Sequence, residues 1–393
     1  MSLTTYAEVR PWIHRIKEKV QLRQMPPWFA DPRFGEFRND RSLTGSEIDA
    51  ITAWVDTGGP EGSSERRLAG APATAAANVP DRLPDYVVES PEFEIPATGV
   101  IPVFTFWQRL AIRERLWIEA LRATPSNSRM VHHASVAVAS LPPGAELGSA
   151  AIWPGGPVLD GVPLKDGQPL SDVSAETFGQ PLLFYVPGGG TLWLPRGIGK
   201  ALDPGKFLVW GFHFTTGGKV ERGRIRLEVW TARSPVEYEA VTITAVNQVT
   251  TAGRVFSPDA SGKLTLPPIP PHAADWQVTG SVLFDEDVTL HALWPHMHHR
   301  GKDMTFRVRY PTGREEVLLS VPRYDFNWQL TYDLAQPKRI PAGSLVTAVA
   351  HYDNSSGNPH NPDPANPVEW GPQSWNEMFN PFLEITYDTR RLR

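Results

Sequence analysis

The stretch His291-Ala-Leu-Trp-Pro-His296-Met-His298-His299-Arg-Gly-Lys-Asp303 decides how this chain is interpreted. Four apolar residues precede the histidine pair in an alternating, strand-like run, and the alternation predicts that they share one side: Val288, Leu290, Ala292 and Trp294. His296 and His298 are predicted to continue that side, so two imidazoles can converge on one ion. Chance alone gives about 0.3 such pairs in this composition, and a solvated or hydrogen-bonded histidine cluster at a strand end remains the alternative.

The composition limits the chemistry. Because the chain has 0 cysteines, disulfides, thiolate metal sites and covalent haem attachment through Cys-x-x-Cys-His are excluded within it. Histidine, carboxylate and methionine remain as strong metal ligands. With a formal net charge of -5 and no basic run, we expect no nucleic-acid partner. No segment approaches the roughly 18 apolar residues of a transmembrane helix, and the N-terminus shows no signal-peptide core.

The pattern of short runs predicts an all-β fold. From about residue 84 onward, alternating segments are interrupted by Pro and Gly, and the chain contains 39 prolines. This is typical of antiparallel β-sandwiches. A length of 393 residues suits more than one domain. We expect one sandwich domain over residues 84–234 and a second over 235–393.

A helical segment precedes the sandwiches. Apolar residues at helical spacing run from Tyr6 to Val20, and Met25-Pro-Pro-Trp28 ends this helix. Thr44-Gly-Ser-Glu47 is a capping box that starts a second helix, which ends at Gly58-Gly59-Pro60. Residues 1–66 are therefore predicted to be helical, and residues 67–83 to form a linker.

Three histidines of the first half form a second candidate set. His132 and His133 open an apolar run, and His213 follows about 80 residues later in Trp210-Gly-Phe-His-Phe-Thr. Neighbouring strand residues point to opposite faces, so the adjacent pair can share a metal only at a bulge or a strand end. Otherwise one histidine is core and the other is solvated. Three imidazoles would suit Cu or Zn.

Met378, in Gln373-Ser-Trp-Asn-Glu-Met-Phe-Asn380, is the remaining soft ligand. A buried methionine usually fills a core. Beside His296 and His298, however, a thioether would favour Cu(I).

In their order and approximate spacing, these residues resemble the copper type II, ascorbate-dependent monooxygenases, the family of peptidylglycine α-hydroxylating and dopamine β-monooxygenases. The similarity covers roughly residues 84–390. It implies two jelly-roll-type β-sandwiches with one copper ion in each, facing each other across a solvent-filled cleft. The implied ligands of the electron-supplying copper are His132, His133 and His213, and those of the oxygen-binding copper, which would be catalytic, are His296, His298 and Met378. Asp303 and Glu377 are candidates for orienting the imidazoles.

The departures from the family concern the substrate. An arginine that holds the substrate carboxylate in peptide-hydroxylating members is replaced by Trp294, and a tyrosine is replaced by Phe382, whereas Asn380 is retained. We therefore expect a less anionic, more aromatic or apolar small molecule than a peptidyl-glycine. The family's disulfides cannot form here.

Residues 1–66 have a separate resemblance. Arg10-Pro-Trp, Met25-Pro-Pro-Trp28 and the helix containing Trp54 are similar to the C-terminal part of a small bacterial cytochrome c domain, in which the corresponding methionine is an axial haem ligand. The resemblance implies that haem c is possible only in a longer form of the protein, where it could deliver electrons in place of ascorbate. The alternative is a helical pair that packs on the first sandwich.

The sequence therefore predicts a monooxygenase with two copper ions per chain that hydroxylates a C–H bond of a small organic substrate with O₂ and ascorbate or another electron donor. A non-catalytic copper-binding or electron-transfer protein is the alternative, and a carbohydrate- or partner-binding sandwich is a third interpretation. The secreted habit of the family implies a periplasmic or secreted location. Five other histidines are not expected to bind metal: His14, His272, His291, His351 and His360. His299 is expected at most to substitute as a ligand or to donate a proton.

Overall fold

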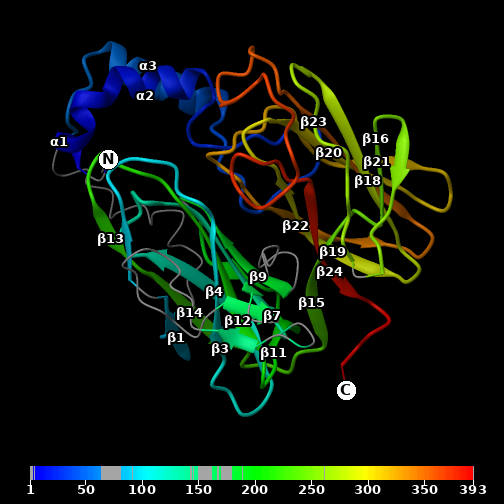
Figure 1. Ribbon diagram of the computed structural model, residues 1–393. Helices are drawn as coiled ribbons and strands as arrows, with labels where there is room; N and C mark the ends of the chain where they lie inside the picture. Colours follow the sequence, from blue (N-terminus) through cyan, green and yellow to red (C-terminus); the bar gives the residue numbers. More distant parts are fainter. Residues whose placement is uncertain are drawn as a thin grey trace.

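The computed structural model (Figure 1) describes residues 3, 5–62, 81–90, 92–141, 144, 146–148, 162–165, 168–169, 179–187, 189–260 and 262–392. Residues 67–80 of the predicted linker lie outside this range. The all-β class, with a short helical segment in front, is confirmed. In the described part of the chain, no helix is both long enough and apolar enough to cross a membrane.

The helix predicted from the Thr44 capping box begins at Gly45, as expected. The helices are α1 (Tyr6–Val9), the 3₁₀ helix η1 (Arg10–Trp12), α2 (Ile13–Gln21) and α3 (Gly45–Asp56). At the start of α3, the Thr44 hydroxyl accepts the backbone N–H of Glu47 at 3.3 Å, and the Glu47 carboxylate accepts the backbone N–H of Thr44 at 2.8 Å. At its end, Gly58 and Gly59 have φ values of 89° and 59°, which favour glycine.

The first sandwich consists of two main sheets. The four-stranded sheet has the order β3-β12-β5-β9, and the facing strands have the order β1-β14-β4-β11, with β10 beside β4. The bounds are β1 (Tyr86–Glu89), β3 (Phe104–Arg109), β4 (Leu116–Pro125), β5 (Val131–Ala139), β9 (Gly179–Tyr185), β10 (Leu192–Trp193), β11 (Ile198–Leu202), β12 (Phe207–Phe214) and β14 (Ile225–Thr231). Small sheets join β2 (Phe93–Ile95) to β13 (Glu221–Gly223), and β6 (Glu146–Gly148) to β7 (Val162–Lys165) and β8 (Gln168–Pro169).

The second sandwich pairs a six-stranded sheet with four strands of the larger sheet. The six strands have the order β17-β16-β18-β23-β20-β21, and the facing four have the order β15-β24-β19-β22. The bounds are β15 (Tyr238–Thr244), β16 (Gln248–Thr251), β17 (Arg254–Phe256), β18 (Trp276–Leu283), β19 (Val288–His296), β20 (Gly301–Arg309), β21 (Glu315–Val321), β22 (Tyr332–Ile340), β23 (Leu345–Tyr352) and β24 (Asn380–Tyr387).

One sheet runs through both sandwiches. β11 pairs in parallel with β15, through Ile198 opposite Tyr238 and Gly199 opposite Glu239. The facing strands of the two sandwiches therefore form a single nine-stranded sheet, which also contains β10. In Figure 1 the green strands of the first sandwich meet β15 and β24 at this junction. The expected division near Ser234-Pro235 falls in the connection between β14 and β15, next to the shared pairing.

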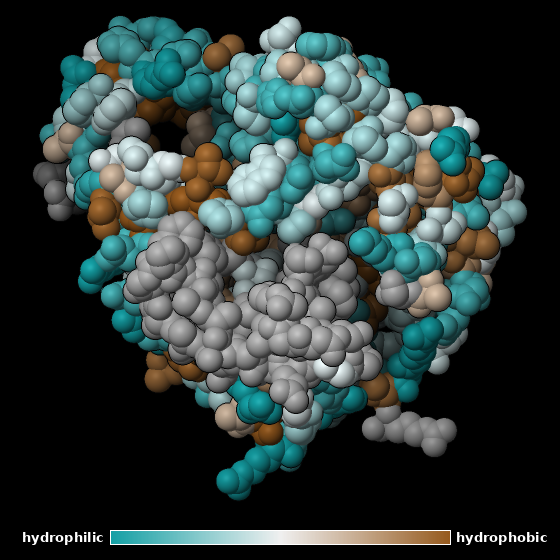
Figure 2. Space-filling model, in the orientation of Figure 1, coloured by the Kyte–Doolittle hydropathy of each residue, from teal (hydrophilic) through white to brown (hydrophobic). Residues whose placement is uncertain are grey.

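The hydrophobic cores nevertheless stay separate. The core of the first sandwich is built from residues between Phe93 and Val229. That of the second is built mainly from residues between Ala245 and Ile385, with two additions from earlier in the chain, Trp28 and Val186. Each half thus buries its own apolar residues, and two earlier side chains cross into the second core. On the face shown in Figure 2, hydrophobic atoms of the described residues lie in separate patches.

The segment after α2 packs mainly on the second sandwich. Trp28 is buried against Tyr332, with ring centroids 4.8 Å apart, and Phe37 forms an antiparallel bridge with Leu334. Backbone N–H groups of Asp31 and Ala335 donate to the carbonyls of Ser320 and Glu36. The residues that follow α2 therefore cover the edge strand β22 of the second sandwich.

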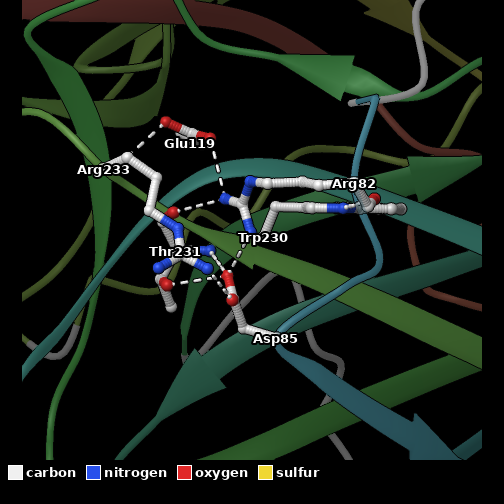
Figure 3. Close-up of polar contacts among 6 residues, drawn as sticks. All are labelled: Arg82, Asp85, Glu119, Trp230, Thr231 and Arg233. Carbon is white, nitrogen blue, oxygen red and sulfur yellow. Dashed lines mark hydrogen bonds and ion pairs between the residues drawn. The ribbon is translucent and has the colours of Figure 1, made fainter.

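A polar network attaches residues 81–85 to the first sandwich (Figure 3). The Arg82 guanidinium donates to Asp85 at 2.7 Å and to Glu119 at 2.9 Å, and Asp85 also accepts the backbone N–H of Thr231 at 2.8 Å. These hydrogen bonds lower the pKa of Asp85 to about 2, although burial opposes the shift. The charged Asp85 therefore anchors the start of β1.

A buried ion pair lies where the two sandwiches join. Lys200 of β11 is 2.6 Å from a Glu384 oxygen of β24, and the two side chains are 4% and 13% exposed. Thr242 of β15 donates to Glu384 at 2.5 Å, and Lys200 donates to the Pro181 carbonyl of β9 at 3.1 Å. Four strands from both halves therefore share one polar cluster.

We predict that Glu384→Gln destabilises the protein by about 3–5 kcal/mol, because it leaves the Lys200 charge buried without a counter-charge. The double variant Lys200→Met/Glu384→Leu should recover most of that loss. Urea denaturation measures both. The control is Glu18→Gln, which breaks the exposed Arg15–Glu18 pair and should change stability by less than about 1 kcal/mol. Equal effects of Glu384→Gln and Glu18→Gln would contradict the prediction.

Candidate metal centre

A β-bulge places the adjacent histidines of the first sandwich. In the pairing of β5 with β12, His133 lies opposite His213 and Val131 lies opposite Phe214, so His132 is the extra residue. The bulge allows consecutive side chains to approach one another, and the imidazole centroids of His132 and His133 are 5.3 Å apart. The geometric condition that the sequence demanded of this pair is therefore met.

A second bulge, in β19, changes which residues face the core. Against β24, the register of β19 shifts between Leu290 and Ala292, which makes His291 the extra residue. Against β22 the pairing is also irregular at this point, but there the longer strand is β22, with residues 334–337 left between the two registers. Val288 and Leu290 belong to the second core, as do Leu293 and Met297, but Ala292 and Trp294 do not. The expectation that Val288, Leu290, Ala292 and Trp294 share one side is therefore wrong.

After the bulge, Trp294 and His296 share the face turned away from the second core. The Trp294 ring lies 5.0 Å from that of His296 and 3.6 Å from that of Phe184 in β9 of the first sandwich, measured between centroids. The bulge thus directs the end of β19 toward the first sandwich.

The two histidine sets form one cluster. Between the sets, His133 lies 6.0 Å from His296, and His213 lies 6.0 Å from His298, as ring centroids. Within them, His133 and His213 are 3.6 Å apart and His296 and His298 are 5.3 Å apart. The expectation of a solvent-filled cleft between the sets is therefore wrong for this structure, in which the sandwiches close on each other.

The cluster buries imidazole nitrogens that have no hydrogen-bond partner. Both ring nitrogens of His132 and of His296 are buried in this state, as is Nε2 of His133 and of His298. A buried polar atom without a partner costs free energy, and native structures normally avoid it. Six such nitrogens lie in one place, and hydrogen bonding by Asn327 and Gln329 opposes the effect of burial on the pKa values of His132 and His296. Copper or zinc, which bind neutral imidazole, fit this donor set.

The rings are gathered but not converged on one point. Among the described residues, no group of three or more His, Cys, Asp or Glu side chains is arranged to hold a metal ion. The rings of His133 and His213 stack at an interplanar angle of 30°, so they turn their faces toward each other. Because the lone pair of an imidazole nitrogen lies in the ring plane, stacked rings do not direct their nitrogens at one ion. The donors are therefore present, and ring rotations would be needed to direct their lone pairs to a common centre.

Backbone contacts fix the tautomer of His298. Its Nδ1 lies 3.1 Å from the Asn376 carbonyl oxygen, which can only accept, so Nδ1 carries the proton. The neutral ring then has its lone pair on Nε2, the buried atom without a partner. This is the arrangement of a metal-ligating histidine oriented by a backbone carbonyl.

Glu377 holds the loop that carries His298. Its carboxylate accepts the backbone N–H of His298 at 2.8 Å, that of Arg300 at 2.6 Å and that of Met378 at 3.3 Å. Burial raises the pKa of Glu377 to about 7, against the effect of these hydrogen bonds. Glu377, proposed from the sequence as an orienting residue, thus positions the His298 backbone rather than an imidazole N–H.

Met378 lies on the same edge as His296. Asn380 is the register partner of His296 in the β19–β24 pairing, and its amide nitrogen is 3.4 Å from the Met378 sulfur. Met378 is half-buried and is not part of the second core. Core filling, the ordinary role of methionine, therefore does not explain its position. Phe382 pairs with Trp294, and their rings stack at 4.5 Å.

Burial keeps the cluster neutral. Removal from water lowers the pKa of His132, lowers that of His296 to about 4, and lowers those of His133, His213 and His298 well below the usual range. Repulsion among the imidazoles adds to the shift. Neutral imidazole is the form that binds metal.

Phe326, in the loop after β21, was missed by the sequence reasoning. Its ring stacks on His132 at 4.6 Å and lies 5.7 Å from His298 and 4.2 Å from His299. It thus covers one side of the cluster and contacts histidines from both sandwiches. Only its aromatic character and its place in a Tyr324–Trp328 loop could have drawn attention to it.

The remaining candidates lie outside the cluster or at its rim. Asp303 bonds Nδ1 of His351 at 2.7 Å, so it orients a histidine that is not one of the five, and His291 lies 3.1 Å from the Thr386 hydroxyl. His14, His272 and His360 are exposed. Met25, the axial ligand implied by the cytochrome resemblance, is 39% exposed.

No family model matches this chain, and no curated protein matches it. Among solved structures, allantoicase has 8% identity over 61% of this chain and 74% of its own, with a TM-score of 0.18. A Paenibacillus xanthan lyase has 9% identity over 79% of this chain and 26% of its own, with a TM-score of 0.19. A structure of infectious bursal disease virus, Gt strain, has 11% identity over 81% of this chain and 76% of its own, with a TM-score of 0.19. At these TM-scores the similarities support no inference about this chain.

We predict that the metal-free protein loses stability as the pH falls from about 6.5 toward 4. In this window the unfolded histidines take up protons that buried His291 and His296, each with a pKa of about 4, do not. Each such group lowers the unfolding free energy by on the order of 1 kcal/mol per pH unit. Glu377, with its raised pKa, acts in the opposite direction, but a single carboxyl cannot offset several histidines. Urea denaturation in chelator at pH 7.5, 6.0 and 5.0 measures the slope, and His291→Gln should reduce it. Constant stability over this range would rule the prediction out.

Proposed function

We propose that the protein is a copper-dependent monooxygenase that hydroxylates a C–H bond of a small organic substrate with O₂ and an external electron donor. The observation that supports it best is the gathering of five histidines from both sandwiches, of which His132 and His213 are half-buried and the others buried: His132, His133, His213, His296 and His298. Three features favour copper over hard cations: their buried nitrogens, the absence of thiolate ligands, and the thioether of Met378, which lies two residues before Asn380, the register partner of His296.

The two sets have different ligand types, which suits different tasks. His132, His133 and His213 would hold one ion through imidazoles alone, and His296, His298 and Met378 would hold the other with a sulfur donor. When bound, copper supplies one-electron transfer and the binding of O₂. The protein contributes the rest: the Asn376 carbonyl keeps Nε2 of His298 unprotonated, and Glu377 fixes the backbone that carries it.

The surroundings of the second set favour an apolar substrate. Trp294 and Phe382 are 5% and 3% exposed and stack on each other beside His296. Such a wall excludes water from the reacting position, which limits side reactions. Asn380, whose amide contacts the Met378 sulfur, would keep that ligand in place.

A non-catalytic copper-binding or electron-transfer protein is the second candidate. The direct contact between the two histidine sets favours it, because it leaves little room for a substrate between them. Ascorbate or a haem c domain of a longer form would be the electron donor in either case, and a periplasmic or secreted location remains part of the proposal.

We predict that the purified protein, loaded with copper and dialysed, holds two copper ions per chain by elemental analysis. His213→Ala and His298→Ala should each lose one ion, because each removes a donor from a different set. His14→Ala, which changes an exposed histidine of α2, is the matched control and should keep both. Unchanged copper content in both His213→Ala and His298→Ala would refute the assignment of the sets.

The same preparations separate the two candidate functions. A monooxygenase should show copper- and reductant-dependent O₂ consumption, and Met378→Leu should lower the rate at least tenfold while the all-histidine set keeps its ion. We expect the change in rate because leucine has the size of methionine but no sulfur donor. Two bound ions without any O₂ consumption would favour the non-catalytic alternative.

A further inference from the structure

We propose that Phe184 of the first sandwich is the specificity-determining residue of the substrate subsite, and that this subsite accepts a neutral, planar aromatic ring. The inference rests on the proposed function, because it identifies the substrate class of the same centre. It adds a residue from the opposite half of the protein to Trp294 and Phe382.

Three aromatic rings from three strands meet beside the second histidine set. Phe184 of β9 lies 3.6 Å from Trp294 of β19 and 5.4 Å from Phe382 of β24, and Trp294 lies 4.5 Å from Phe382, all between ring centroids. Trp294 is in turn 5.0 Å from His296. Phe184 therefore covers a tryptophan ring that is itself the neighbour of His296, a proposed ligand of the oxygen-binding copper.

The position of Phe184 follows from the alternation of β9. Leu183 and Tyr185, on either side of Phe184, pack on the first core, so the alternation turns Phe184 to the other face. Leu182, which also belongs to the first core, is the extra residue of a bulge against β5 and does not break this alternation. β9 therefore turns Phe184 toward the second sandwich as a consequence of strand geometry. Phe184 is only half-buried, in contrast to the two rings that it contacts. Of the three rings, Phe184 is therefore the one whose side chain can most easily rotate away from its neighbours.

The chemistry of this trio selects against anions. Neither phenylalanine carries a polar side-chain atom, and the indole N–H of Trp294 already donates to the Gln329 carbonyl at 3.0 Å. No donor of these three side chains is left for a carboxylate, whose burial without a partner is costly. Offset stacking on an indole is, by contrast, favourable for any planar ring.

A ligand ring that stacks on Trp294 must take the place that the Phe184 ring occupies. Phe184 therefore competes with the substrate, and its size sets how much of the indole a ligand can cover. Replacement by alanine would leave an apolar space of the kind that binds aromatic molecules.

The test uses the metal-free full chain, so that it does not depend on copper loading. Equilibrium dialysis measures the affinity for benzyl alcohol and for benzoate, which share a ring and differ in charge. We expect Phe184→Ala to bind benzyl alcohol at least tenfold more tightly than the unchanged protein, with no comparable gain for benzoate. Phe184→Leu should give a smaller gain in the same direction, and serves if the alanine variant fails to fold.

Methyl NMR of the 6 methionines shows where benzyl alcohol binds. In Phe184→Ala, benzyl alcohol should shift the Met378 signal, assigned from Met378→Leu, and leave that of Met130 in place. The control Phe212→Ala opens a comparable space in the first core, which contains Met130, and should not affect Met378. No gain in Phe184→Ala and Phe184→Leu, a shift of Met130 instead of Met378, or an equal gain for benzoate would overturn the proposal. Failure to bind copper would refute the proposed function but leave this binding result intact.

Discussion

The parallel pairing of β11 with β15 is the constraint on which the rest of the structure depends. It continues a sheet of the first sandwich into the second, so the two halves cannot be placed independently. Once this register is set, Phe184 of β9 contacts β19 and β24, Lys200 reaches Glu384, and His133 of β5 faces His296 of β19. A cluster built from residues more than 150 positions apart thus follows from hydrogen bonds between backbones.

That arrangement has an electrostatic consequence. Five imidazoles share a volume from which water is largely removed, so protonation is opposed both by desolvation and by mutual repulsion. Glu377, the carboxylate that holds the His298 loop, is itself engaged by backbone N–H groups. The fold therefore keeps a set of neutral donors whose free lone pairs favour a cation, and this is the physical basis of the proposed copper chemistry.

Sequence patterns predicted the class of fold and the identity of the clustered residues, and missed how they are oriented. The capping box at Thr44 and the alternating runs depend on local interactions, which a sequence displays directly. The bulge at His291 does not, because an extra residue in one strand is defined only against its partners; the sidedness assigned to Ala292 and Trp294 was wrong for this reason. The contacts of Phe184 and Phe326 with the site depend on how the sandwiches close, which no local pattern of residues records.

The bulge in β19 also constrains how the gene can change. The side of the strand that carries Leu290 faces the second hydrophobic core, whereas Trp294, four residues later, faces the histidine cluster. One extra residue between them causes this change of face. Loss of that codon would exchange the two faces of the rest of β19, turning Trp294 and His296 toward the second core and Leu293 and Met297 away from it. Point substitutions at individual positions are a much smaller disturbance. A change in the number of residues in this segment would therefore disturb the centre more than most single substitutions within it.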